Sequence, residues 1–477
     1  MTQAFDLIVL GAGPAGCHAA CAAARHGLSV ALIDEAVAAG GQVYRAPAPG
    51  HSAGSAKLAP DSIAGETLRT ALDAAQVRTF FGRRAWAVTR GFAVDTAGPD
   101  RHETFGAARL IAATGTYERV VPFPGWTLPG VIGLAAATIL IKSQGMVPGR
   151  RVVVAGCGPL LVAVAAKIAA SGAELAAVVD LAGRSDWISA VPALARRPDL
   201  LRRGIGWALR LGQARVPIYF RHTVISADGT DRVERVSLAP VDGAGAPVAG
   251  AHITLDTDAL VIGHGLVPGA EVPRLLRASM SYEPLRGGWI PKVDTYGRTS
   301  IDGLYAIGDG AGIRGAEPAA LAGKIVGITA AHDAGSIDQY GLTALVRPLN
   351  RQRSSYAAFA DASAAFMALR PAQVRAIEAQ TIVCRCEDVT RASIDAAARD
   401  GAADVNQLKH FTRCGMGPCQ GRMCGDVAAE LLAQARGVSR KAVGYWTGRP
   451  PLRPVPLADL VGAFDYADIP IPKPAPL

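Results

Sequence analysis

Five of the eight cysteines crowd into residues 384–424, near the C-terminal end of the 477-residue chain. These are Cys384, Cys386, Cys414, Cys419 and Cys424. Since no secretory signal is visible, the cluster predicts a metal site more than a set of disulfides. An iron–sulfur cluster takes four thiolates, which two short-spaced pairs separated by a small helical excursion can supply. A four-cysteine zinc site and unligated cysteines are the alternatives, although zinc pairs usually have roughly two to four intervening residues and Cys384 and Cys386 have one.

A glycine-rich loop near the N-terminus has the spacing of a nucleotide site. Gly11-Ala-Gly-Pro-Ala-Gly16 lies between an apolar segment and an alanine-rich stretch. Such glycines allow a tight turn, a close approach to a pyrophosphate and tight helix–strand packing, with the phosphates at the helix N-terminus. Asp34, or Glu35 beside it, falls about twenty residues on, where a carboxylate binds ribose hydroxyls. The pattern favours a dinucleotide site over a glycine turn that binds nothing; its phosphate-binding residues would be Gly11, Gly13, Pro14, Ala15 and Gly16.

A second copy of this pattern begins at Arg151. It has the loop Gly156-Cys-Gly-Pro-Leu-Leu161 and an acidic residue, Asp180, after the next apolar segment. Leu161 takes the place of the third glycine, at the point where helix and strand are in closest contact. We therefore expect a weakened or lost site, in which Gly156, Gly158 and Asp180 hold NAD(P), ATP or nothing.

These sites need particular elements to position them. The order strand, glycine loop, helix, strand, occurring twice, predicts an α/β chain with two Rossmann-like dinucleotide-binding domains. A further short strand ends at Gly308-Asp309, where a carboxylate can accept a hydrogen bond from a ribityl hydroxyl. Capped helices near Thr390 and Asp426 predict a small helical domain around the cysteines.

The amino-acid composition limits the kinds of partner that the chain can be expected to bind. The net charge is +9 with only 19% charged and 50% hydrophobic residues, which excludes a disordered chain and gives no nucleic-acid signature. Arginines concentrate in residues 184–221, where we expect amphipathic helices with a solvated basic face, or a docking surface for an acidic subunit or anionic lipid. No targeting segment is visible, so a cytoplasmic protein with at most peripheral membrane contact is expected.

Together these residues resemble flavoproteins with the disulfide-reductase-like fold. The resemblance implies that FAD lies across the first domain. The loop at Gly11 and Gly13 would then hold the pyrophosphate, and Asp34 would bind the adenosine ribose. The resemblance adds the flavin-side residues Gly41, Gln42, Thr114, Gly115, Gly308 and Asp309. The chain lacks the redox CxxC pair and the C-terminal His-Glu pair of that family, so dithiol chemistry is not expected.

Residues 113–130, the second glycine loop and the cysteine segment look like those of the flavoprotein A-type subunits of opine oxidase and of D-hydroxyproline and L-proline dehydrogenases, and of the B subunit of hydrogen cyanide synthase. The cysteine segment also resembles the bacterioferritin-associated ferredoxin domain. That resemblance implies [2Fe-2S] ligands at Cys384, Cys386, Cys419 and Cys424, with Cys414 spare. The implied division is an FAD-binding domain (1–120 and 288–350), a second dinucleotide domain (121–287), a helical linker (351–380), a [2Fe-2S] domain (381–437) and a proline-rich tail (438–477).

The resemblance implies the α subunit of a heteromeric dehydrogenase. A β flavoprotein subunit, with a possible small γ subunit, would carry the substrate site and oxidise the C–N bond of an amino acid, imino acid or opine, with a quinone or dye-like acceptor. Alternatives are a self-sufficient NAD(P)H-dependent reductase and a non-enzymatic ATP-sensing or assembly subunit. No catalytic residue can be assigned from the sequence. His264 follows an apolar segment and could face a cofactor, although a structural histidine is more common.

Overall fold

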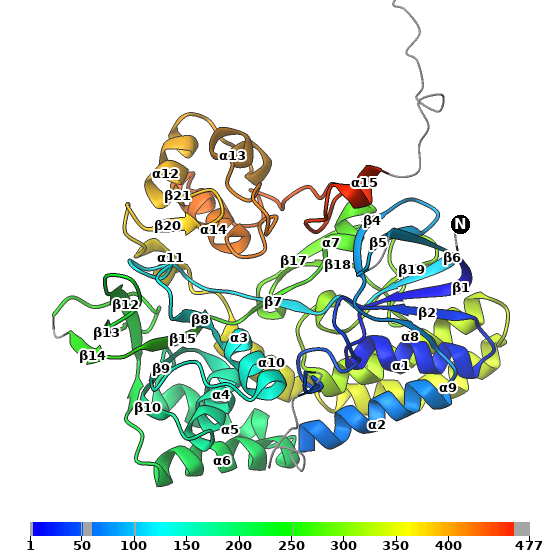
Figure 1. Ribbon diagram of the computed structural model, residues 1–477, viewed down its shortest axis with the longest axis horizontal. Helices are drawn as coiled ribbons and strands as arrows, with labels where there is room; N and C mark the ends of the chain where they lie inside the picture. The colour runs from blue at the N-terminus through cyan, green and yellow to red at the C-terminus, as the bar shows by residue number, and fades with distance from the viewer. Residues whose placement is uncertain (1–2, 49, 51–59, 100–101, 251, 462–477) are drawn as a thin grey trace, which may run out of the picture.

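The structure is a computed structural model that describes residues 3–48, 50, 60–99, 102–250 and 252–461. Two α/β domains lie side by side, and a small helical module lies against them on one side (Figure 1). Part of the expected proline-rich tail, residues 462–477, lies outside the described residues. The two predicted Rossmann-like domains are confirmed.

The first domain is built on a seven-stranded sheet in the order β3-β2-β1-β6-β5-β4, with β19 added to β6. β5 runs antiparallel to β4 and β6, whereas the other pairs are parallel. β6 has three partners because β5 pairs with its first half and β19 with its last residues. The strands are β1 (Gln3–Leu10), β2 (Val30–Ile33), β3 (Arg78–Phe80), β4 (Arg84–Val88), β5 (Ala93–Ala97), β6 (His102–Ala112) and β19 (Leu304–Ala306).

Two helices of this domain pack almost backbone to backbone. They are α1 (Pro14–Arg25), which follows β1, and α8 (Ala316–Asp333), which follows β19. A Cβ atom at Gly323 would lie 2.1 Å from the Ala15 carbonyl oxygen, and one at Gly327 would lie 2.3 Å from that of Ala19. Only glycine permits this approach. Both helices begin where parallel strands end, so their N-termini reach the same edge of the sheet. The outer helices are α2 (Pro60–Ala74) and α9 (Gln339–Ser354).

The second domain has a five-stranded parallel sheet in the order β11-β10-β9-β15-β8. The three inner strands β10, β9 and β15 are buried along most of their length, as expected of a parallel sheet covered on both faces, whereas the edge strands β11 and β8 are partly exposed. The strands are β8 (Val131–Gly133), β9 (Arg151–Gly156), β10 (Glu174–Asp180), β11 (Ile218–Phe220) and β15 (Ala259–Gly263). The helices are α3 (Leu134–Ile139), α4 (Gly158–Ala170), α5 (Arg184–Leu194) and α6 (Pro198–Gln213), and a small antiparallel sheet comprises β12 (His222–Asp228), β13 (Arg235–Pro240) and β14 (Ile253–Asp256).

Short strand pairs connect the domains. β7 (Thr116–Glu118) leads out of the first domain and pairs with β16 (Leu266–Pro268), by which the chain returns. β17 (Met280–Glu283) pairs with β18 (Gly288–Pro291) beside them. After α9, the helices α10 (Ala357–Met367) and α11 (Pro371–Arg375) lead to the C-terminal module.

The C-terminal module has its own core. Its elements are β20 (Ile382–Cys384), β21 (Val389–Thr390), α12 (Arg391–Arg399), α13 (Val405–Thr412) and α14 (Gly425–Ala435). The Thr390 side chain accepts a hydrogen bond from the Ser393 N–H and so caps α12 as predicted, and Ile394 and Ala397 of this helix are buried. The module covers one side of the second domain, and α5 and α6 lie on the opposite side (Figure 1). Across the described residues, every helix is too short or too polar to cross a bilayer.

Candidate cofactor sites

The first glycine loop forms a cradle that side chains would fill. Gly11 has φ +105°, and a Cβ there would lie 2.3 Å from the Ala113 carbonyl oxygen. A Cβ at Gly16 would lie 1.8 Å from the Gly11 carbonyl oxygen. Gly13 differs, since the nearest atom to its Cβ position is the Cα of Gly41 at 3.9 Å. Gly11 and Gly16 are therefore required by the fold itself, whereas the space at Gly13 is free for a ligand.

The acidic residues after β2 have different surroundings. Asp34 is largely buried, and its carboxylate accepts hydrogen bonds from the backbone N–H groups of Ala12 at 2.5 Å and Ala36 at 2.7 Å. Burial raises the pKa of Asp34. Glu35 is half exposed, and its carboxylate lies 3.7 Å from Arg84 and 3.9 Å from Arg453. Asp34 thus holds the glycine loop in place, and Glu35 points away from it.

The flavin-side residues converge on the edge where β1, β6 and β19 end. Gly41 has φ +59°, and its Cβ position lies 2.8 Å from the Gly13 Cα, so the two glycine segments touch. Gln42 is exposed and accepts a hydrogen bond from Arg45 at 3.1 Å. On the other side, Thr114 donates to the Gly269 carbonyl oxygen, and the Gly269 N–H donates to Gly115.

Gly308 and Asp309 bring the end of β19 against the first loop. Gly308 has φ +64°, and a Cβ there would lie 2.8 Å from the Ala15 Cβ. The Asp309 carboxylate accepts hydrogen bonds from the N–H groups of Arg314 at 2.8 Å and Gly315 at 2.9 Å, just before α8, and burial raises its pKa. The predicted residues from five separate segments therefore lie together, and the glycine cradle fits a dinucleotide such as FAD.

The second glycine loop is covered by the chain itself. Gly156 has φ +145°, and a Cβ there would clash with the Gly263 carbonyl oxygen. Its equivalent in the first domain, Gly11, has the same relation to the Ala113 carbonyl oxygen. At Gly158, a Cβ would lie 2.7 Å from the Met367 Cγ and 3.6 Å from the Phe366 Cβ. The last turn of α10 thus lies where a phosphate would approach the loop.

The acidic residue of the second domain is also engaged. Asp180 is buried, accepts hydrogen bonds from the Trp187 indole N–H at 2.8 Å and the Ala182 N–H at 2.9 Å, and has its pKa raised to about 6 by burial. The Trp187 ring stacks on Phe366 with centroids 4.2 Å apart. Trp187 and the last turn of α10 therefore contact the acidic residue and the glycine loop that an ordinary dinucleotide site uses for the ribose and the phosphates.

Three polar residues lie where the two domains meet. His264 is buried and accepts a hydrogen bond from the Val121 N–H at 3.1 Å, while burial lowers its pKa to about 3. It is thus a neutral structural histidine. The Glu118 carboxylate accepts from the Ala135 N–H at 2.8 Å at the start of α3, and burial raises its pKa to about 7. Arg119 is buried and forms an ion pair at 2.7 Å with Asp426 of the C-terminal module.

Three of the clustered cysteines have their sulfur atoms close together. The Sγ atoms of Cys384, Cys414 and Cys424 all lie within 4.8 Å of one another and are buried. Cys384 ends β20, Cys414 follows α13 and Cys424 precedes α14. Hydrogen bonds from the thiols of Cys414 and Cys424 hold the pKa of Cys384 well below its usual range. A buried thiol set of this kind fits an iron–sulfur cluster or another thiophilic metal centre.

Cys386 and Cys419 are the more exposed members of the group. They interact with each other, and desolvation raises the pKa of Cys386. Gly417 makes the close approach possible, because a Cβ there would lie 2.4 Å from the Cys386 Cβ. An ion pair between Arg413 and Glu387 at 2.7 Å joins the same two loops. The structure thus brings all four predicted ligands to one region and adds Cys414, the predicted spare, to its buried side.

The C-terminal module is anchored to the large domains by polar contacts. The Trp126 indole N–H donates to the Ile382 carbonyl oxygen at 2.7 Å, two residues before Cys384. Arg422, between Cys419 and Cys424, pairs with Glu271 at 2.9 Å. Both contacts are therefore made by residues of the module that lie next to its cysteines in the sequence.

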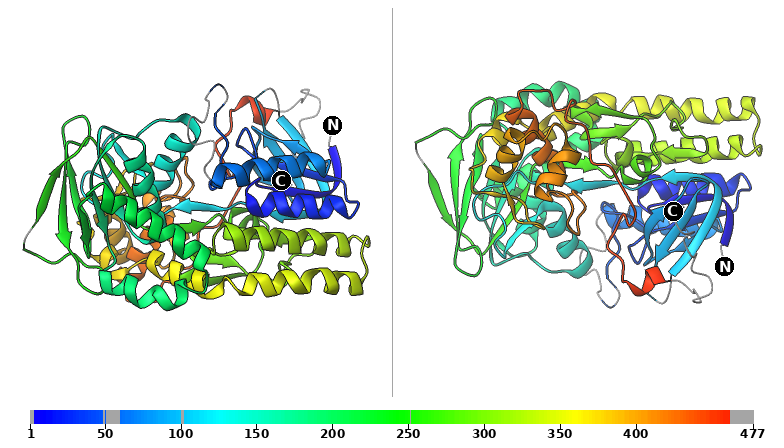
Figure 2. Two further views of the ribbon diagram at one scale, coloured as in Figure 1. Left: turned by 90° about the horizontal axis from the view of Figure 1, so that it is seen from below. Right: turned by 90° about the horizontal axis from the view of Figure 1, so that it is seen from above.

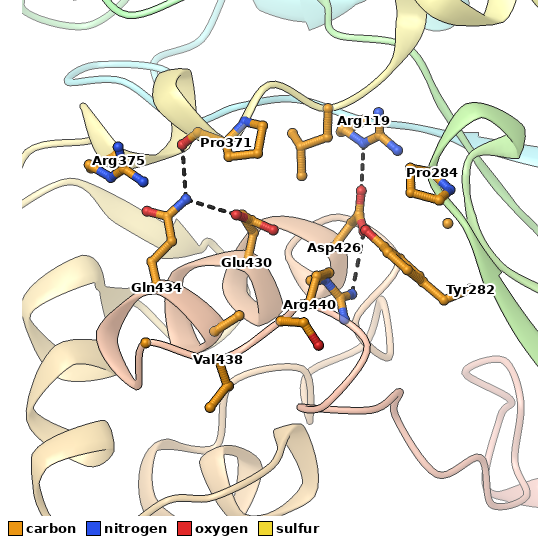
Figure 3. A pocket seen from close by; sticks show the side chains of 15 residues that line it. Arg119, Tyr282, Pro284, Pro371, Arg375, Asp426, Glu430, Gln434, Val438 and Arg440 are labelled. Carbon is orange, nitrogen blue, oxygen red and sulfur yellow. Dashed lines mark hydrogen bonds and ion pairs between the residues drawn. The ribbon is translucent and has the colours of Figure 1, made fainter. Parts of the chain in front are cut away.

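A cavity of about 540 Å³ lies along this boundary, between β17, α11 and α14. Figure 3 shows Asp426 between Arg119 and Arg440, and Gln434 between Glu430 and the Pro371 carbonyl. Since Asp426 is paired with two arginines and Glu430 accepts a hydrogen bond from Gln434, we attribute the cavity to the docking of the module and assign it no ligand.

Comparisons with known proteins show the family to which the chain belongs. Residues 5–335 match the pyridine nucleotide-disulphide oxidoreductase family, which implies FAD, and residues 378–463 match the sarcosine oxidase A3 domain. The chain is therefore a flavin-dependent oxidoreductase of the disulfide-reductase-like class with an added C-terminal module.

Individual relatives narrow this class. The A-type subunit of opine oxidase from Rhizobium meliloti (strain 1021) is 35% identical over 96% of this chain and 99% of that protein. Hydrogen cyanide synthase subunit HcnB of Pseudomonas protegens is 30% identical over 96% of this chain and 97% of that protein. The crystal structure of L-proline dehydrogenase from P. horikoshii matches with a TM-score of 0.71 at 21% identity, over 96% of this chain and 80% of that one, and shares the fold. The chain belongs to the family of the opine oxidase A-type subunits and HcnB, which confirms the resemblance found in the sequence.

Several residues were outside the sequence predictions. Trp187 and Met367 close the second site, and Arg119 and Trp126 anchor the module. None stands in a motif, and their partners are distant in the sequence. Arg119 and Trp126 carried a weak signal, because both lie in the segment 113–130 that supported the family resemblance.

Proposed function

We propose that this chain is the electron-transfer α subunit of a heteromeric dehydrogenase or oxidase, with FAD and a [2Fe-2S] cluster as its redox groups. Its β flavoprotein partner, with or without a small γ subunit, oxidises the C–N bond of an amino acid, imino acid or opine. A quinone or dye-like acceptor takes the electrons. We extend this proposal to the expected domain division, with residues 381–437 as the [2Fe-2S] domain.

One observation carries the proposal: the chain has a free cradle for one dinucleotide and a buried thiol group, whereas side chains of α5 and α10 lie against the second glycine loop and its acidic residue. A self-sufficient NAD(P)H reductase needs that second site for its reductant. Without it, the electrons must come from elsewhere, and a partner subunit is the simplest source. The relatives from opine oxidase and hydrogen cyanide synthase are also named as subunits of those enzymes.

The chain's own residues define what each cofactor would meet. The loop at Gly11 and Gly13 would hold the FAD pyrophosphate, and the edge formed by Thr114, Gly115 and Asp309 would hold its ribityl and flavin part. Cys384, Cys386, Cys419 and Cys424 would bind the cluster, with the Cys414 thiol beside them. FAD exchanges one or two electrons and a [2Fe-2S] cluster exchanges one, so the pair suits a subunit that links two-electron oxidation to one-electron carriers.

Stopped-flow mixing with NADH and NADPH tests the proposal against its rival. The purified full chain should show no flavin bleaching with either nucleotide, and dye reduction with proline or an opine should appear only after the coexpressed partner subunit is added. Rapid bleaching by NADH or NADPH would establish the self-sufficient reductase instead.

The non-enzymatic alternative, an ATP-sensing or assembly subunit, predicts a different result. It requires ATP to bind the full chain at the second loop with a measurable heat, whereas the covered Gly158 predicts none. Isothermal titration with ATP decides this point.

A further inference from the structure

The positive charge of the chain is concentrated on one surface. Residues 184–221 contain eight arginines, two aspartates and neither lysine nor glutamate, so they contribute +6 of the net +9. In the structure they form α5, α6 and β11 with their connections. We call the outward side of α5 and α6 the arginine face. Seen from below, these two helices lie at the front of the second domain (Figure 2, left).

The acidic groups of this surface are already neutralised. Asp199 pairs with Arg197 at 2.6 Å, and Asp186 lies 3.5 Å from Arg221. Arg203 pairs with Asp61 of α2 at 3.0 Å. Four exposed arginines have no acidic partner among the described residues; they are Arg196, Arg202, Arg210 and Arg215. The field of the arginine face is therefore positive and uncompensated.

Apolar side chains stand among these arginines. On α5, Ile188 is 70% exposed and Val191 is 45% exposed; on α6, Ile205 is 48% exposed and Leu209 is 61% exposed. Arg202, Ile205 and Leu209 follow the helical spacing of three and four residues, so they lie on the same side of α6. Guanidinium groups and branched apolar side chains thus point outward from one helix surface.

We propose that the arginine face docks on a membrane surface rich in anionic lipid. Interfacial helices combine arginines that bind lipid phosphates with apolar side chains that enter the headgroup boundary. A protein partner usually matches charges of both signs, but the two aspartates of this face are already paired with arginines, so its unpaired groups are cations and apolar side chains. A plane of phosphates is the surface with the complementary charge. Because the face lies opposite the C-terminal module, docking leaves the cysteine centre accessible to other subunits (Figure 1).

Vesicle cosedimentation of the full chain, alone and with its coexpressed partner, tests this inference. The protein should sediment with phosphatidylcholine–phosphatidylglycerol vesicles at low salt, and much less with phosphatidylcholine alone. High salt should release it, because exposed charges are screened. This measurement is independent of the redox activity, so the docking and the proposed function can fail separately.

Two variants locate the docking surface. The R202Q/R210Q variant should weaken binding to the anionic vesicles by at least about tenfold, since each basic side chain near such a surface contributes on the order of a factor of five. The I205S/L209S variant should weaken it on both vesicle types. The matched control R232Q/R235Q removes the same charge from exposed arginines at β13 and should bind as the unaltered chain does.

Three results would overturn the inference. One is sedimentation that does not depend on anionic lipid, and another is equal loss in the R232Q/R235Q control. The third is an R202Q/R210Q variant that keeps its vesicle binding but no longer copurifies with the partner subunit, which would make the arginine face a protein interface. Unchanged thermal unfolding midpoints of the variants would show that folding is intact.

Discussion

At the scale of single residues, the five cysteines show what spacing can and cannot predict. Their crowding identified the centre, and the structure brings them to one region. The choice of four ligands came from a family resemblance, and the buried Cys414 lies only 3.9 Å from Cys424, sulfur to sulfur. Sequence spacing could not reveal this contact, because it depends on how α13 and α14 pack.

Single serine substitutions test the ligand set. Replacing Cys384, Cys386, Cys419 or Cys424 should each remove most of the iron, because a [2Fe-2S] cluster needs four thiolates. Cys414→Ser should keep the iron and alter only the shape of the EPR signal of the reduced protein. Cys157→Ser, in the second domain, is the control. Loss of iron in Cys414→Ser as complete as in Cys424→Ser would make Cys414 a ligand.

Substitutions of Gly11 and Gly13 in the first loop form a matched pair of tests. Gly13→Ala should fold normally and lose most of its FAD, since the new Cβ meets no protein atom closer than 3.9 Å but enters the space of the pyrophosphate. Gly11→Ala should unfold more easily, because its φ is +105° and its Cβ would clash with Ala113. Flavin content and thermal midpoints separate the two effects. Full FAD content in Gly13→Ala would move the cofactor away from this loop.

The raised pKa of Glu118 predicts that the free energy of unfolding depends on pH. This pKa rises from 4.5 to about 7 on folding because the carboxyl group is buried. The folded chain therefore holds the proton more tightly, and the resulting stability is present below pH 4.5 and lost as the pH rises through 7. Glu118→Gln keeps the acceptor for the Ala135 N–H and does not titrate. The stability of the unaltered chain relative to this variant should fall from about pH 5 to about pH 8 by roughly 2–3 kcal/mol in denaturant titrations; a flat difference would contradict the assignment.

At the scale of elements, both glycine loops, their strands and the following helices were predictable from local spacing. A weakened second site was predicted from Leu161, which the structure buries fully. The contact of α10 with the second glycine loop was not predictable, because α10 begins almost two hundred residues after Gly158 in the sequence. Helix propensity and periodicity describe α10 as a helix but do not say what Phe366 and Met367 cover.

At the scale of the whole molecule, the C-terminal module is held against the large domains by buried charges. The Arg119–Asp426 pair is almost completely buried, with the two side chains 2% and 10% exposed. Breaking such a pair leaves an uncompensated charge. Residues 119 and 426 are far apart in the sequence, so this contact could not be inferred from it, although the separate module could.

Asp426→Asn measures this docking. The substitution should lower the free energy of opening of the module by about 2–4 kcal/mol, seen as faster hydrogen exchange in α14. Asp199→Asn, which breaks an exposed pair, should change it by less than about 1 kcal/mol. Equal effects of the two variants would mean that the module is held by its apolar contacts alone.

The proposed function requires that this one chain carries both FAD and a [2Fe-2S] cluster. The most direct test is cofactor analysis of the full chain purified without oxygen, followed by EPR of the dithionite-reduced protein. The expected result is about one FAD, two iron and two sulfide per chain, with a spin-½ signal at low temperature. Zinc at about one per chain with no such signal would contradict it.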